Sequence, residues 1–167
     1  GAVIRSTNGG ETFVPMAFMS DLMLVQAHPT AGNTVYATGR GFVRRSTDGG
    51  ATFADLPVPV AGARVTELVV HPANPNLIYL RADAQGYWGS LAFRSTDGGM
   101  TYTRLPLDNP RSIKVAPSDS SVVYCFDGER LLVSKDMGAT WEDARADAVR
   151  VTTFAVHPSQ PGTVLAE

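Results

Sequence analysis

The sequence predicts an all-β fold assembled from repeats of about 40 residues, and two motifs that share one period carry this prediction. The first motif is an eight-residue phrase that starts with Ser, has Asp or Asn at its third position, continues with glycine and ends on an aromatic residue. Its serines are 40, 49 and 39 residues apart, and the four copies occupy residues 6–13, 46–53, 95–102 and 134–141. A chain with such a period is a repeat protein.

The second motif is an apolar run that ends in a proline turn and is followed by another apolar run. Its prolines are 43, 45 and 41 residues apart, and they are Pro29, Pro72, Pro117 and Pro158. The 16 glycines and 11 prolines stand mostly at turns between short apolar runs, as in all-β chains. No window keeps a 3.6-residue apolar period, so we expect no long helix.

Each repeat predicts four antiparallel strands. The first strand runs into the proline turn, the second is the following apolar run, the third ends in the eight-residue phrase and the fourth starts at its aromatic residue. In the second repeat the expected strands are 65–70, 76–81, 90–95 and 101–105. Four antiparallel strands per repeat without helices are typical of a β-propeller blade. We therefore expect residues 1–167 to form a single propeller domain or a propeller segment.

The two ends of the chain each carry half a repeat. Residues 163–167 match a second strand, and residues 1–5 match a third strand. We expect about four blades, with the last blade completed by both chain termini, because such pairing removes exposed sheet edges. A homodimer that closes a larger ring and a segment of a larger propeller remain open alternatives.

The eight-residue phrase resembles the Asp-box, or BNR repeat, of β-propellers. Its Asp or Asn accepts hydrogen bonds from backbone N–H groups of the turn, its glycines adopt positive φ, and its aromatic residue packs back between sheets. Asn8 has no acid to offer, so this position favours hydrogen bonding over proton transfer. The expected structural residues are Ser6, Asn8, Gly10, Phe13, Ser46, Asp48, Gly50, Phe53, Ser95, Asp97, Gly99, Tyr102, Ser134, Asp136, Gly138 and Trp141.

Composition narrows the function classes. The formal net charge is −2, so nothing suggests the basic face that nucleic-acid binding needs. No apolar stretch approaches the roughly 20 residues of a membrane span. His28, His71 and His157 all precede a turn proline, which favours a role in the repeat over a metal site, and we expect neither a metal nor a cofactor. Cys125, the single cysteine, is expected inside a strand.

An insertion at 82–90 is the largest departure from the repeat, and it lengthens the hairpin between the second and third strands of its blade. It carries Tyr87 and Trp88, with Arg81 beside it. Aromatic residues near polar groups suit stacking on a sugar ring or anchoring a protein partner. The alternative is that Trp88 covers its own blade.

Charged residues are expected where the first strands begin, at the mouth of the central channel. Asp21, Arg64 and Arg150 each stand eight residues before a turn proline, and Arg111 opens the equivalent strand of another repeat. They predict an anion pocket, with Arg40 and Arg130 from neighbouring hairpins at its rim. The alternative is that Asp21 neutralises an arginine and the set is structural.

The two motifs together resemble those of xyloglucanase-type glycoside hydrolases and sortilin-like propellers, and more distantly those of sialidases. The resemblance implies a secreted, periplasmic or cell-surface protein. Xyloglucanase-type enzymes use two aspartates, for which the candidates here are Asp21 with Asp83 or Asp127. We expect a module that binds glycan or protein ligands through its loop face. The alternatives are a glycoside hydrolase or a fragment of one, and an architectural segment of a larger surface protein.

Overall fold

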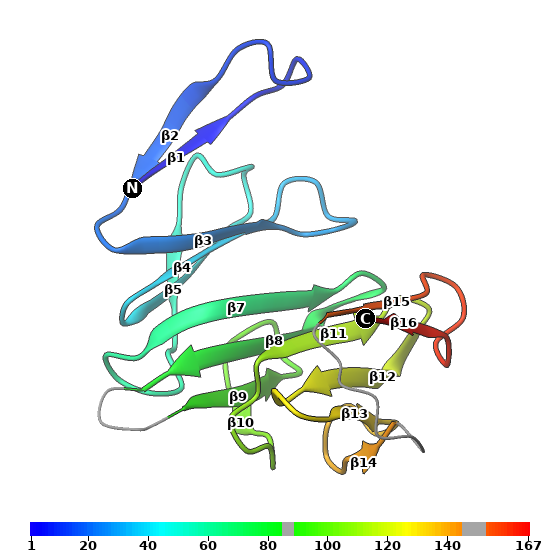
Figure 1. The fold of residues 1–167 in the computed structure, drawn as a ribbon. Coiled ribbons are helices and arrows are strands. Elements are labelled where there is room, and N and C mark those ends of the chain that lie inside the picture. Colours follow the sequence, from blue (N-terminus) through cyan, green and yellow to red (C-terminus); the bar gives the residue numbers. More distant parts are fainter. Residues whose placement is uncertain (85–88, 145–152) are drawn as a thin grey trace.

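The computed structural model describes residues 1–84, 89–144 and 153–167, and this part of the chain is all-β (Figure 1). Three antiparallel sheets have four strands each, in chain order from one edge to the other. Blade 1 contains β3 (Leu22–Ala27), β4 (Val35–Gly39), β5 (Phe42–Ser46) and β6 (Ala54–Leu56). Blade 2 contains β7 (Arg64–His71), β8 (Asn74–Asp83), β9 (Ser90–Ser95) and β10 (Thr103–Arg104). Blade 3 contains β11 (Ser112–Ala116), β12 (Asp119–Phe126), β13 (Leu131–Ser134) and β14 (Glu142–Asp143).

Two further sheets have two strands each and flank the three blades. The N-terminal half-blade pairs β1 (Ala2–Arg5) with β2 (Val14–Phe18), and the C-terminal half-blade pairs β15 (Phe154–Val156) with β16 (Val164–Ala166). They lie at opposite ends of an open arc (Figure 1). The expectation that both termini complete one shared blade is therefore wrong for this structure, because β1 and β2 form one sheet and β15 and β16 form another.

The core lies between blades, because successive side chains of a strand point to opposite faces of its sheet. On β8, Leu80 packs in the cluster between blades 1 and 2, whereas Tyr79 packs in the cluster between blades 2 and 3. Both side chains are fully buried. Tyr124 and Phe154 join blade 3 to the C-terminal half-blade, and Val3 belongs to the cluster at the N-terminal half-blade. Each blade is thus stabilised by its two neighbours.

The eight-residue phrases form four turns with one hydrogen-bond pattern, and we call them the Ser-Asp turns (residues 6–13, 46–53, 95–102 and 134–141). In the second, Asp48 Oδ1 accepts from the Ser46 hydroxyl at 2.7 Å and from the Thr52 N–H at 2.9 Å. The Thr52 hydroxyl donates to Asp48 Oδ2 at 2.6 Å. Gly49 and Gly50 have φ values of 73° and 94°, which glycine adopts without steric cost.

The first Ser-Asp turn keeps this pattern with an amide in place of the carboxylate. Asn8 Oδ1 accepts from the Thr12 N–H at 3.0 Å, and Asn8 Nδ2 donates to the Thr12 hydroxyl at 2.9 Å. The direction of the side-chain hydrogen bond is reversed, yet the turn is the same. The group at this position therefore acts through hydrogen bonds and needs no negative charge.

An arginine before the serine of a Ser-Asp turn reaches across to the next blade, and we call this contact the arginine latch. Arg5 Nη1 donates to the Gly49 carbonyl at 3.1 Å, Arg45 Nη1 to the Gly98 carbonyl at 3.4 Å and Arg94 Nη1 to the Met137 carbonyl at 3.0 Å. The acceptor is the same position of the following Ser-Asp turn each time.

The histidines fasten the proline turns. His28 Nδ1 accepts from the N–H groups of Thr30 and Ala31, and His71 Nδ1 accepts from the N–H of Ala73. His71 Nε2 lies 3.0 Å from the Ala116 carbonyl of blade 3, so this ring also joins two blades. In the described residues no group of three metal-ligating side chains gathers. No helix in them is long and apolar enough to cross a membrane.

Candidate ligand-binding face

Those residues expected at the channel mouth that the structure describes lie along one edge of the blades, which we call the loop face. Strand register places them there, because the start of each first strand pairs with the end of the second strand. Leu22 pairs with Gly39, Arg64 with Asp83 and Ser112 with Phe126. The loop face therefore carries Asp21 and Arg40 on blade 1, Arg64 and Asp83 on blade 2, and Arg111, Asp127 and Arg130 on blade 3.

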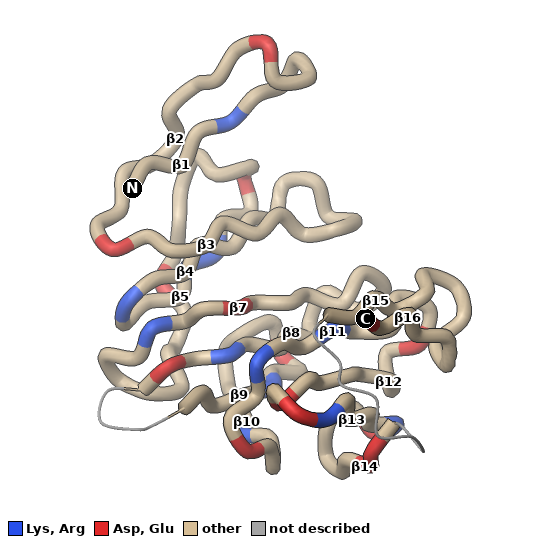
Figure 2. Tube along the Cα trace, viewed as in Figure 1, with Lys and Arg blue, Asp and Glu red and all other residues tan. Residues whose placement is uncertain are grey.

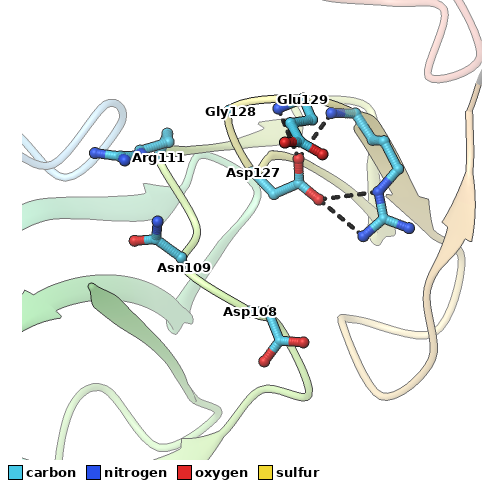
Figure 3. Close-up of a pocket in the computed structure, with 7 residues that line it drawn as sticks. Asp108, Asn109, Arg111, Asp127, Gly128 and Glu129 are labelled. Carbon is cyan, nitrogen blue, oxygen red and sulfur yellow. Dashed lines mark hydrogen bonds and ion pairs between the residues drawn. The ribbon is translucent and has the colours of Figure 1, made fainter. Parts of the chain in front are cut away.

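A pocket of about 350 Å³ opens on the loop face at blade 3 (Figure 3). The β10–β11 loop supplies one side and the β12–β13 hairpin supplies the other. It is lined by Asp108, Asn109, Arg111, Asp127, Gly128, Glu129 and Arg130. Three of these were predicted as ligand or catalytic residues, namely Arg111, Asp127 and Arg130. Apart from Gly128, the residues that line it have charged or amide side chains.

Asp127 is held firmly within this pocket, and its side chain is only 9% exposed. Its Oδ1 accepts from the N–H groups of Arg130 and Glu129 at 2.7 and 2.9 Å, and its Oδ2 receives the Arg130 guanidinium at 3.0 Å. Burial alone would raise the pKa of Asp127, but these hydrogen bonds and the arginine charge hold that pKa below its usual range. Asp127 is therefore ionised, which does not suit a general acid.

Arg111 differs from Arg130, because its guanidinium takes part in no ion pair within the described chain. Figure 3 shows its side chain extending away from the Asp127–Arg130 pair. Its backbone N–H donates to the Phe126 carbonyl at 2.7 Å, which fixes the residue at the pocket rim. Arg111 is thus an exposed cation available to a ligand.

Asp83 and Arg81 belong to a network inside blade 2. Asp83 Oδ1 accepts from the Ser90 hydroxyl at 2.6 Å, and Arg81 Nη1 donates to the same hydroxyl at 2.8 Å. Arg81 also lies 3.4 Å from Glu67 Oε2, and its side chain is 17% exposed. Arg81 is thus directed into the sheet, whereas the Asp83 side chain is 45% exposed.

Asp21 stands alone in the loop before β3 and is exposed. Its φ of 55° is unusual for a residue other than glycine. No hydrogen bond or ion pair engages its carboxylate in the part of the chain that the structure describes. Of the three predicted aspartates only Asp127 lines the blade 3 pocket, so the structure does not bring the three into one pocket.

A groove of about 380 Å³ runs along the inner strands β3, β7 and β11. Glu67 is the acidic residue in it. Its carboxylate accepts from the Ile113 N–H at 3.1 Å and from the Ser112 hydroxyl at 3.2 Å, so it joins blade 2 to blade 3. Burial raises the pKa of Glu67 above its ordinary value, and the nearby Arg81 offsets only part of this effect.

Sequence reasoning missed Asp108, Asn109 and Glu67 as site residues. Asn109 precedes a proline and adopts a φ of 47°, and an Asn-Pro pair is a recognisable turn signal. Three predicted ligand residues lie outside the described residues, and they are Tyr87, Trp88 and Arg150.

Parts of known proteins resemble this chain in sequence and in fold. No family model matches the chain. A xyloglucanase from Hypocrea jecorina (strain QM6a) is 37% identical over 120 residues, which are 66% of this chain and 14% of that protein. The structure of a GH74 enzyme from Niastella koreensis superposes with a TM-score of 0.77 at 20% identity, over 99% of this chain and 29% of that one. A structure described as YCF48 bound to D1 peptide gives a TM-score of 0.58 at 15% identity, over 80% of this chain and 43% of that one.

The structural likeness shows a β-propeller fold that resembles xyloglucanase. This chain spans about a seventh of the xyloglucanase and less than a third of the Niastella koreensis chain. It therefore corresponds to part of larger propeller chains, which agrees with the open arc of Figure 1.

Proposed function

We propose that this chain forms glycan-binding blades of a xyloglucanase-like glycoside hydrolase, and that its loop face contacts the polysaccharide. The observation that carries the proposal is the 37% identity with a xyloglucanase over 120 residues. The exposed charged groups and the pocket of the loop face support it. In this proposal the Ser-Asp turns are Asp-boxes with a structural role, and the protein acts outside the cytoplasm.

Asp21 is the proposed catalytic carboxylate of this chain. It is exposed, and no described partner holds its carboxylate. Glycoside hydrolysis needs a second carboxyl group across the scissile bond. Within this chain Asp83 suits that role better than Asp127, because its side chain is 45% exposed rather than 9%. Tyr87 and Trp88 remain the proposed stacking residues.

The test measures binding and hydrolysis of xyloglucan by the chain, with mannan as the control polysaccharide. We expect binding to xyloglucan in gel-retardation titrations and release of reducing ends on long incubation. Asp21→Asn should keep the affinity and abolish hydrolysis, whereas Asp55→Asn, an exposed aspartate on outer strand β6, should leave both unchanged. Equal retardation by xyloglucan and mannan, or none by either, would refute the proposal.

A second candidate function is the binding of a charged peptide at the blade 3 pocket. The charged and polar lining of that pocket favours it, and no aromatic residue is among the residues that line it. The YCF48 structure described as bound to D1 peptide has the same fold. If the chain retains charged peptides and not xyloglucan, and if Arg111→Gln removes that retention, peptide binding replaces glycan binding as the function of this face.

A further inference from the structure

Two arginines from different blades lie directly opposite each other on the loop face. Arg40 of the β4–β5 hairpin and Arg64 at the start of β7 form an isolated antiparallel bridge. Residues opposite each other in such a bridge have Cβ atoms about 4.5–5.5 Å apart on one face. Both arginines are exposed, and Figure 2 shows the basic positions of these two segments side by side.

The close approach of these two segments is built into the backbone. The Gly41 N–H donates to the Ala63 carbonyl at 2.8 Å, next to the two arginines in sequence. Gly41 and Gly62 both adopt positive φ, at 75° and 71°, and a Cβ on Gly41 would lie 3.6 Å from the Gly62 Cα. The arrangement therefore belongs to the fold and is not a chance meeting of two long side chains.

The acidic groups around this pair are Asp21 and Asp83. Asp83 Oδ1 accepts a hydrogen bond from the Ser90 hydroxyl at 2.6 Å and lies 3.6 Å from Arg81 Nη1. No ion pair joins Asp21 or Asp83 to Arg40 or Arg64 among the described residues. Like charges directly opposite in an antiparallel pair are destabilising, and here two guanidinium groups without an ion-pair partner in the described chain stand opposite each other. The chain as a whole is slightly acidic, with a net charge of −2.

Blades 2 and 3 differ from blade 1 in the order of their charged residues, as far as the structure describes them. The position at the end of the second strand is acidic in blade 2, where it is Asp83, and in blade 3, where it is Asp127. In blade 1 it is Arg40, and the acid Asp21 precedes the first strand instead. This reversal of charge order within blade 1 brings one arginine opposite another.

We propose that Arg40 and Arg64 together bind a carboxylate of a uronic-acid residue in a glycan. The guanidinium group presents paired N–H donors that match the two oxygens of a carboxylate, and two such groups on one face can hold it from both sides. A bound anion also relieves the repulsion between the arginines. The choice of a glycan rests on the proposed function, and it extends the ligands of the loop face from neutral to acidic polysaccharides.

The experiment compares oligogalacturonate with neutral xyloglucan oligosaccharide as probes, by titration calorimetry at low salt. The variants are Arg40→Gln and Arg64→Gln, and Arg104→Gln on exposed strand β10 is the matched control. Each of the first two variants should weaken oligogalacturonate binding about tenfold, because each removes a charged hydrogen-bond donor. The control should stay within twofold of the unmodified chain. Xyloglucan affinity should change far less than oligogalacturonate affinity in the two variants, because a neutral glycan has no carboxylate for the guanidinium groups to bind.

The midpoint of thermal unfolding without ligand is a second readout. It distinguishes a ligand site from a structural role of the two arginines. Either substitution removes like-charge repulsion, so the unfolding midpoint should stay the same or rise. A midpoint that falls in both variants would show that the arginines stabilise the fold, and would overturn the site. The same conclusion follows if oligogalacturonate binds the Gln variants as tightly as it binds the unmodified chain.

The arms of this experiment separate the inference from the proposed function. Loss of xyloglucan binding with retention of arginine-dependent oligogalacturonate binding would refute the neutral-glucan function and support the carboxylate site. Xyloglucan binding without oligogalacturonate binding would support the neutral-glucan function and refute the carboxylate site. Binding of poly-glutamate in place of oligogalacturonate would refute the glycan assignment and identify an acidic peptide as the ligand.

Discussion

Two side chains of blade 2 donate to one backbone carbonyl of blade 3, and removing both should cost more than the sum of the two single losses. Arg94 Nη1 lies 3.0 Å from the Met137 carbonyl oxygen, and the Tyr79 hydroxyl lies 3.1 Å from it. Arg94→Met or Tyr79→Phe alone leaves the carbonyl with one donor, so each should cost about 1 kcal/mol of unfolding free energy. The double variant leaves it without a side-chain donor and should cost about 3 kcal/mol or more.

Urea unfolding followed by tryptophan fluorescence measures these differences, with calorimetric midpoints as a second assay. For a chain of this size each 1 kcal/mol lowers the midpoint by about 2–4 °C. Arg44→Met is the control, because Arg44 pairs at 2.6 Å with Asp55, whose side chain is 76% exposed, and such pairs contribute about 0–1 kcal/mol. If the double loss equals the sum of the single losses within about 0.5 kcal/mol, the shared carbonyl is not the basis of the coupling.

Three further outcomes follow from single residues. Gly39→Ala should destabilise the chain by about 1–3 kcal/mol, because the new Cβ would clash with the Asp21 carbonyl and the Phe42 ring, whereas Gly32→Ala, with open space around it, should be neutral in the same urea titration. Hydrogen bonds led by that from the Thr101 hydroxyl lower the pKa of Asp97 to about 2, so its contribution to stability should be present above about pH 4 and be lost as the pH falls toward 2. Asp97→Asn should therefore reduce the steepness of the acid side of a stability–pH profile, and an unchanged slope would contradict this. Burial raises the pKa of Cys125 to about 12, so a thiol reagent at pH 8 should label it only as fast as the chain unfolds, and rapid labelling of the folded chain would be evidence against its burial.

The blade was predictable from the sequence because its signals are local. The proline turns and the eight-residue phrases mark where strands end, and the observed strands of blade 2 match the expected ones within a few residues, as in β9 at Ser90–Ser95. The closure of the arc was not predictable in the same way. Matching half-repeats at 1–5 and 163–167 show which strands they resemble, but the angle between stacked blades depends on packing between sheets.

The candidate site was predictable in position and only partly in role. The strand offset from each turn proline predicted that Arg64 and Asp21 stand where a first strand begins, and β3 and β7 begin at Leu22 and Arg64, because register follows from the repeat. The offset does not predict which charged side chains form ion pairs with one another. Arg81 faces Glu67 inside the sheet, and Arg40 meets Arg64 across a blade junction, and both outcomes depend on contacts between segments distant in sequence.

The arginine latches run in one direction, from each blade to the one that follows it in the chain. At the latch position of blade 3 the residue is Val133, so the series ends there, and the contact to the C-terminal half-blade depends on the Tyr124 hydroxyl, 2.8 Å from the Pro161 carbonyl, and on the apolar cluster around Phe154. Stability in repeat arrays is approximately a sum of nearest-neighbour terms. Unfolding is therefore expected to be graded along the arc, with β15 and β16 exchanging their amide hydrogens before the latched blades do.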